Sequence, residues 1–129
     1  MDMVYIIIAL ALLQFFIFGS LVARARVKFN VAAPAVTGNP IYERYYRVHY
    51  NTMELLVVFV PSMLLFGEYV SSLVAACLGL IFIIGRIIYF RAYVTDPEKR
   101  GLGFGITMLP TSILLLGGLG GAIWSAATT

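Results

Sequence analysis

Long runs of apolar residues, separated by short polar segments, fill most of the chain. Each run is long enough for a helix to cross a hydrocarbon core of about 30 Å, which takes roughly 20 residues. The runs are continuous and rich in Leu and Ile, without the alternation of a membrane β-barrel strand, and this favours helices. The pattern predicts an all-α fold, a single up-down bundle of four membrane-spanning helices. These are expected at about residues 3–23, 42–67, 69–93 and 102–126.

The composition agrees with a chain that has lipid as its solvent. Of its 129 residues, 61% are hydrophobic and 12% are charged, which is too apolar for a soluble domain of this size. The net charge of +3 does not indicate a nucleic-acid partner, because so apolar a chain has no soluble surface to offer. Asp2 stands where a signal peptide would be basic, so the first run is expected to be a retained anchor. Cys77 is the single cysteine, so the chain has no disulfide framework and cannot build a metal site from thiols, and Cys77 is expected to be buried.

The nine Lys and Arg residues gather at one end of the predicted bundle. They occupy the first and third connections and the helix ends beside them: Arg24, Arg26, Lys28, Arg44, Arg47, Arg86, Arg91, Lys99 and Arg100. Since basic residues in short loops mark the cytoplasmic side, loops one and three are expected to be cytoplasmic. Both termini are then expected on the opposite side. The second connection is expected to turn near Gly67 and Glu68, and residues 97–100 to form another turn.

One charged residue inside a span carries most of the functional information. An ionised Glu54 in lipid is costly, so it should face protein or a water-filled cavity and have a basic partner. Arg47, Asn51 and Glu54 are spaced i, i+4 and i+7, which places them on one face of a helix. His49 lies elsewhere on the same turn, as a pH-sensitive acid or base or as a helix-end hydrogen-bonding group.

The third predicted helix repeats this arrangement. Arg86, Tyr89 and Tyr93 are spaced i, i+3 and i+7, and Arg100 follows in the adjoining loop. Together the two faces predict a basic pocket that suits a zwitterionic ligand with more negative than positive charge. The alternative for the other basic residues is that they only set topology and contact lipid head groups. The tyrosines at positions 45, 46 and 50 are equally explained as residues of the membrane interface.

Two segments resemble the MAPEG superfamily, the membrane-associated proteins of eicosanoid and glutathione metabolism. Residues 43–54, ERYYRVHYNTME, are similar to its first signature. Residues 85–93, GRIIYFRAY, and 96–100, DPEKR, resemble the second, in the form found in microsomal glutathione transferases of types two and three and in leukotriene C synthase. A His at position 49 is shared with other transferases, whereas the leukotriene C synthase branch has Gln.

The resemblance implies a homotrimer that binds glutathione between neighbouring protomers at the cytoplasmic end. By position, it implies that the tripeptide is contacted by Arg26, Arg47, His49, Asn51, Glu54, Arg86, Tyr89 and Tyr93. Arg100 matches the family arginine that steadies the thiolate, and no metal is implied. A guanidinium suits that role because it stays charged and lowers the pKa of a nearby thiol.

Three hypotheses follow for the function. The first is a membrane-bound glutathione transferase that conjugates glutathione to lipophilic electrophiles from the bilayer, with a glutathione-dependent lipid peroxidase activity as an extension. The second is a non-catalytic protein of the same fold that binds membrane lipids or acts as a scaffold. The third is a small proton-coupled exporter, which would need Glu54 to face a central pathway and would not need Arg100.

Overall fold

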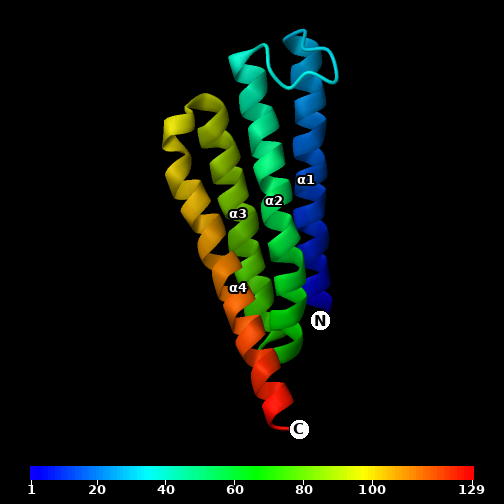
Figure 1. The fold of residues 1–129 in the computed structure, drawn as a ribbon, viewed down its shortest axis with the longest axis vertical. Coiled ribbons are helices and arrows are strands. Elements are labelled where there is room, and N and C mark those ends of the chain that lie inside the picture. Colours follow the sequence, from blue (N-terminus) through cyan, green and yellow to red (C-terminus); the bar gives the residue numbers. More distant parts are fainter.

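Four long antiparallel helices build the whole molecule (Figure 1). The computed structural model describes residues 1–129 and contains no strand. The elements are α1 (Asp2–Lys28), α2 (Pro40–Tyr69), α3 (Ser72–Thr95), the short 3-10 helix η1 (Pro97–Arg100) and α4 (Gly101–Ala127). Both termini lie at one end, and the α1–α2 loop and η1 lie at the other, called here the basic end. All four helices are long and apolar enough to cross a membrane, which confirms the predicted fold class.

Side chains at the helix starts explain where the connections fall. Asn39 caps α2, its side-chain oxygen accepting hydrogen bonds from the backbone N–H groups of Ile41 and Tyr42 at 3.0 and 2.9 Å. Ser71 caps α3 in the same way, accepting from Val74 N–H at 3.2 Å. The expected turn near Gly67 and Glu68 is wrong, because α2 continues to Tyr69 and the turn lies at residues 70–71.

Gly67 therefore serves packing and not chain reversal. A Cβ built on it would lie 3.0 Å from the Met1 sulfur and 3.1 Å from Val4, so its bare face lets the start of α1 approach α2. The segment expected to turn at residues 97–100 is the 3-10 helix η1, capped by the side chain of Asp96. The sequence pattern thus placed the ends of the helices to within a few residues. Gly67 was expected at a turn, whereas it lies within α2 and allows close packing.

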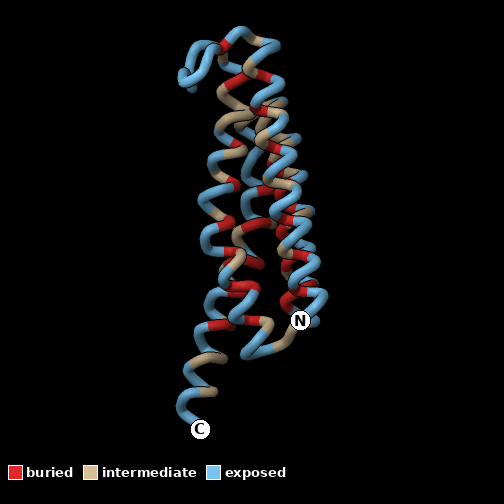
Figure 2. Tube along the Cα trace, turned by 90° about the vertical axis from the view of Figure 1, so that its right-hand side faces the viewer, coloured by how far each residue is buried: buried red, intermediate tan, exposed pale blue.

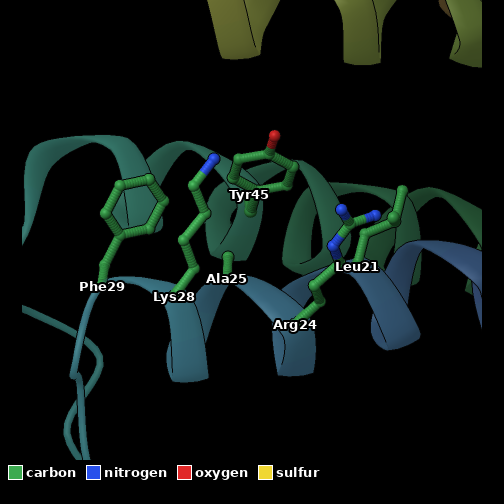
Figure 3. A pocket seen from close by; sticks show the side chains of 6 residues that line it. All are labelled: Leu21, Arg24, Ala25, Lys28, Phe29 and Tyr45. Carbon is green, nitrogen blue, oxygen red and sulfur yellow. The ribbon is translucent and has the colours of Figure 1, made fainter.

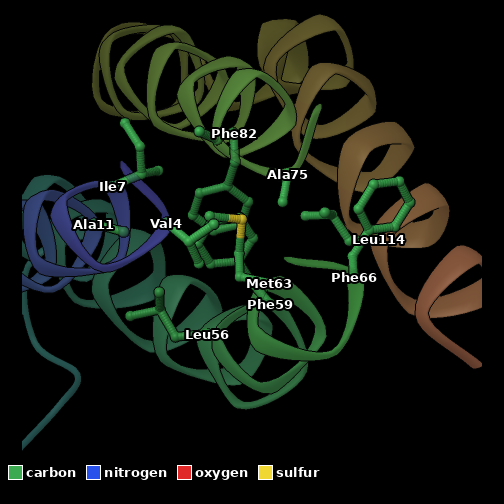
Figure 4. Close-up of a cluster of buried hydrophobic side chains, with 11 residues drawn as sticks. Val4, Ile7, Ala11, Leu56, Phe59, Met63, Phe66, Ala75, Phe82 and Leu114 are labelled. Carbon is green, nitrogen blue, oxygen red and sulfur yellow. The ribbon is translucent and has the colours of Figure 1, made fainter. Parts of the chain in front are cut away.

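A hydrophobic core fills the space between the helices (Figure 4). Its centre is the stacked pair Phe59 of α2 and Phe82 of α3, whose ring centroids are 3.8 Å apart. Figure 2 shows buried positions along the inner faces and exposed ones around the outside. Many of the exposed side chains are large and apolar, as expected of a surface that meets lipid. Cys77 is on that outer surface, so the expectation that it is buried was wrong: Ala75, Ala76 and Gly79 take the inner positions of α3 instead.

Small residues of α4 allow close contact with its neighbours. Cβ atoms at Gly117 and Gly121 would lie 2.5 Å from the Phe66 ring of α2 and 2.9 Å from Val70, the residue that follows α2. At the basic end, a Cβ on Gly103 would collide with the backbone of Tyr89 on α3. Gly103 therefore fixes the distance between α3 and α4 at the level of Tyr89.

Replacing Gly103 by Ala should destabilise the protein and disturb the neighbourhood of Tyr89. The added methyl must push α3 and α4 apart, and overpacking of this kind typically costs about 1–3 kcal/mol. Gly105→Ala is the matched control, because a Cβ there meets nothing within 4 Å. Thermal unfolding in detergent, followed by circular dichroism, should show a lower midpoint for Gly103→Ala alone. Equal midpoints for the two variants would contradict this account of the helix contact.

Candidate functional site

The basic end carries a cavity of about 310 Å³ between α2, α3 and η1. Its walls combine two guanidiniums, one carboxylate, one amide and four phenols. The lining residues are Tyr46, Arg47, Tyr50, Asn51, Glu54, Tyr89, Tyr93 and Arg100. Six of the nine residues expected from the sequence lie in this lining. The helical spacing on α2 and on α3 thus predicted two faces that the fold brings together.

Arg86 lies behind this cavity wall and does not line it. Its side chain is 0% exposed, and its guanidinium joins three helices. Arg86 Nη1 donates to Asn51 Oδ1 at 2.8 Å and to Thr52 Oγ1 at 3.2 Å, both on α2. Arg86 Nε donates to Thr107 Oγ1 of α4 at 3.2 Å. Its Nη2 is buried without a partner in the chain, so within one chain Arg86 orients Asn51 and does not face the cavity.

The two threonines are pre-oriented to receive that guanidinium. Thr52 Oγ1 donates its own proton to Val48 O at 2.7 Å, and Thr107 Oγ1 donates to Gly103 O at 2.7 Å. With the hydroxyl protons committed to their own helices, the oxygen lone pairs are left for Arg86. The Arg86 guanidinium also lies 4.2 Å from the ring centroid of Tyr89, a cation–π distance. A buried cation is therefore held by neutral acceptors and an aromatic face.

The charged groups of the cavity itself are exposed and available. Glu54, Arg47 and Arg100 are all exposed at the cavity surface. Arg100 Nη1 donates to Pro97 O at 2.8 Å, which holds its side chain along η1 and leaves its other donors free. Glu54 lines the same cavity as Arg47 and Arg100 but forms no ion pair with either of them. The basic partner expected for Glu54 is therefore nearby in the cavity but not in direct contact with it.

Two expected site residues lie elsewhere in the same chain. His49 stacks on Phe15 of α1, with ring centroids 4.4 Å apart, and the bare face of Gly19 makes room for it. Arg26 Nη1 donates to Ala35 O at 2.6 Å, and its guanidinium lies 5.0 Å over the Tyr42 ring. Positions two residues apart on a helix differ by about 200° around the axis. His49 and Arg47 therefore point to different sides of α2.

Sequence reasoning missed four residues of this site. Tyr46 and Tyr50 line the cavity, and their i, i+4 spacing continues to Glu54, so the periodicity contained the signal. Thr52 and Thr107 hold Arg86 from two other helices. Nothing local to either threonine indicates a partner more than 20 residues away in the sequence.

Fold and site together define a class: an integral membrane protein of four helices that presents a basic, half-open cavity at one end. A sequence model of the MAPEG family matches residues 3–120. The chain is 41% identical over 119 residues to an uncharacterized protein of Synechocystis sp., covering 92% of this chain and 87% of that one. It is 40% identical over 100 residues to human microsomal glutathione S-transferase 2, covering 77% and 68% of the two chains.

Leukotriene C4 synthase from Bos taurus is 33% identical over 79 residues, which cover 61% of this chain and 53% of that enzyme. The chain belongs to the MAPEG family, as the two signature segments indicated. Its relatives include enzymes named for glutathione transfer, so glutathione-related transferase function is supported at the level of the family.

Proposed function

We propose that the chain is a membrane-bound glutathione S-transferase that conjugates glutathione to lipophilic electrophiles. The observation that carries the proposal is the cavity between α2, α3 and η1, whose lining combines Arg47 and Arg100 with one carboxylate, Glu54. Glutathione carries two carboxylates and one ammonium. Charge-assisted hydrogen bonds from guanidiniums to the carboxylates, and from the ammonium to Glu54, would match all three groups.

Arg100 is proposed to stabilise the glutathione thiolate. A permanently charged guanidinium beside the sulfur favours the anion and raises the fraction of reactive nucleophile. The thiolate then attacks an electrophilic carbon, a sulfur–carbon bond forms, and the leaving group departs with its electron pair. With a lipid hydroperoxide as the second substrate, the thiolate would attack the terminal oxygen and break the O–O bond. The lipid alkoxide would leave and take up a proton to become an alcohol, and a second glutathione would convert the resulting sulfenic acid to glutathione disulfide and water. The outer faces of the helices expose many large apolar side chains that suit a lipid environment, so a lipophilic electrophile would arrive from the bilayer.

The site is proposed to be completed by a second copy of the chain, in a homotrimer. Arg47 and His49 lie on different sides of α2, so one molecule of glutathione cannot touch both within one chain. A neighbour could supply its Arg26 and His49 face to the open side of the cavity, which would also cover Glu54. Arg86 acts in this proposal by orienting Asn51. The basic end is proposed to be cytoplasmic, with both termini on the opposite side.

The structure argues against the exporter hypothesis but does not by itself separate the enzyme from a non-catalytic lipid-binding protein. An exporter needs a polar pathway along the bundle, but the space between the helices is filled by the core around Phe59 and Phe82 (Figure 4). Glu54 lies on the outer side of α2 at the cavity and not in that core. A lipid-binding protein without catalysis would keep the fold and would not need Arg100 near a bound thiol. Turnover separates this alternative from the proposed enzyme.

Glu54→Gln should weaken glutathione affinity by roughly tenfold to a hundredfold, the value of a hydrogen bond to a charged group. The amide keeps the size of the side chain but loses the charge that pairs with the ammonium. Glu68→Gln is the matched control, since Glu68 is exposed on the same helix near its other end. Isothermal titration in detergent measures the glutathione affinity of both variants. If Glu54→Gln binds normally but assembles poorly, Glu54 is structural and its place in the site is wrong.

Turnover with a generic aromatic electrophile tests the proposed activity itself. The purified chain should form the glutathione conjugate faster than glutathione alone in detergent, with saturation in both substrates. Tight glutathione binding without turnover, for a panel of electrophiles and hydroperoxides, would support the non-catalytic alternative instead. Absence of binding and of turnover would reject the transferase proposal.

A further inference from the structure

A second pocket at the basic end opens between α1 and α2, away from the proposed glutathione cavity (Figure 3). Its volume is about 170 Å³, and its lining combines two cations with an apolar and aromatic wall. The lining residues are Leu21, Arg24, Ala25, Lys28, Phe29 and Tyr45. Figure 3 shows the heads of Arg24 and Lys28 on the same side of α1, facing Tyr45 of α2. No acidic residue lines this pocket.

The two cations of this pocket are free to bind an anion. Arg26 and Arg44 use donors on backbone carbonyls, those of Ala35 and Val94 among them. Arg24 and Lys28 are exposed, and neither forms a hydrogen bond within the chain. Their i, i+4 spacing separates them by about 6 Å along the helix, close enough for one phosphate to contact both.

An apolar stripe continues from the pocket along α1 toward the middle of the bilayer. Leu10, Leu13, Ile17 and Leu21 precede Arg24 at intervals of three and four residues, so all lie on one face. Leu13 is 52% exposed and Ile17 is 48% exposed, which leaves this face open to lipid. Cations at the membrane surface with an apolar track below them match the outline of a phospholipid, with its phosphate above its acyl chains.

This pocket faces away from the part of α1 that the proposed glutathione site uses. Arg24 and Arg26 are two residues apart and differ by about 200° around the helix. Arg26 lies beside Tyr42, whereas Arg24 faces the pocket with Tyr45. Tyr45 in turn contacts Phe90 of α3 edge to face, with ring centroids 5.7 Å apart. A lipid in this pocket would therefore not compete with a neighbouring chain for the Arg26 side.

We propose that the Arg24–Lys28 pocket binds the head group of an anionic phospholipid, with an acyl chain along the apolar stripe of α1. A zwitterionic lipid such as phosphatidylcholine fits less well. Its trimethylammonium group would meet two cations and no carboxylate, and the Lys28 ammonium already lies 5.5 Å over the Phe29 ring. The site selects lipids by net negative charge, and it is separate from the proposed transferase activity.

Native mass spectrometry of the full chain in neutral detergent tests this proposal. Phosphatidylglycerol and phosphatidylcholine with identical acyl chains are added at equal concentration. The wild-type chain should retain phosphatidylglycerol in clear preference. Arg24→Gln and Lys28→Gln should each lower that binding about fivefold, the value of one basic residue at a membrane surface. Arg24→Lys, which keeps the charge, should retain most of it.

Lys99→Gln is the matched control, since it also removes one exposed positive charge at the basic end but lies on η1, outside the pocket. It should leave phosphatidylglycerol binding unchanged. Equal retention of the two lipids by the wild-type chain would overturn the proposal without any variant. So would an equal loss in Lys99→Gln, which would indicate general attraction to charge. Displacement of the lipid by inorganic phosphate would show a site for free anions and would overturn the assignment to a lipid.

Discussion

Replacing Arg100 by Ala should lower the rate of glutathione conjugation by about 10²–10³-fold, the cost of removing one preorganised group that stabilises a developing or bound anion. Arg100 is exposed at the cavity surface, and its bond to Pro97 O orients the side chain along η1. Its loss removes a permanent positive charge from the place where the thiolate is proposed to lie. The loss should fall mainly on kcat, because other groups of the cavity still bind the tripeptide.

Lys99→Ala is the matched control for Arg100→Ala. It removes an equal charge from the adjacent position of η1 but does not line the cavity. Steady-state kinetics with a generic aromatic electrophile should separate the two variants by at least tenfold in kcat. Unchanged turnover in Arg100→Ala would remove Arg100 from the thiolate role. Equal losses of kcat in both variants would show that Arg100 acts only through the overall positive charge of this end of the protein.

Arg86→Met should damage stability and glutathione affinity together. The methionine fills part of the space but leaves Asn51 Oδ1, Thr52 Oγ1 and Thr107 Oγ1 without the donor that each now has. Buried polar groups left without partners cost about 1–3 kcal/mol. Asn51 then loses the contact that fixes its orientation in the cavity wall. We expect a lower unfolding midpoint in detergent and, in the fraction still folded, glutathione affinity reduced roughly tenfold or more.

Arg91→Met provides the control on the same helix, because Arg91 is exposed and makes no contact with this network. Its unfolding midpoint and its glutathione affinity should stay close to those of the wild type. Affinity and stability are measured separately, by isothermal titration and by circular dichroism. If Arg86→Met loses stability but the folded protein binds glutathione normally, then Arg86 does not position Asn51 for the ligand. If neither property changes, the network itself has no energetic importance.

The sequence predicted those parts of the site that depend on one helix at a time. The faces Arg47–Asn51–Glu54 and Tyr89–Tyr93 follow from helical spacing, and hydrophobic length sets the four spans that bring them to one end. The side of a helix that meets a given neighbour does not follow from spacing. Spacing already placed His49 on another side of α2 from Arg47, but it could not show that this side packs on Phe15 of α1. Only the family resemblance placed His49 among the glutathione contacts, and that role stays a proposal.

Side-chain contacts between different helices were the second feature that the sequence could not predict. Arg86 was expected to touch the ligand, but Thr52 and Thr107 hold it in the protein interior. The Thr107 contact depends on the packing distance between α3 and α4, which the bare face of Gly103 permits. A spacing rule applied to one segment contains no such distance. The Arg24–Lys28 pocket could not be predicted from the sequence for the same reason, because one of its walls is Tyr45, which belongs to another helix.

The ultraviolet difference spectrum of glutathione bound to the purified chain tests the central claim most directly. The thiolate absorbs where the thiol does not, so the spectrum reports both binding and ionisation in one measurement. The account predicts a saturable thiolate signal at neutral pH, with a lower amplitude in Arg100→Ala and the wild-type amplitude in Lys99→Ala. No thiolate signal at a glutathione concentration that saturates binding, or no binding at all, would contradict it.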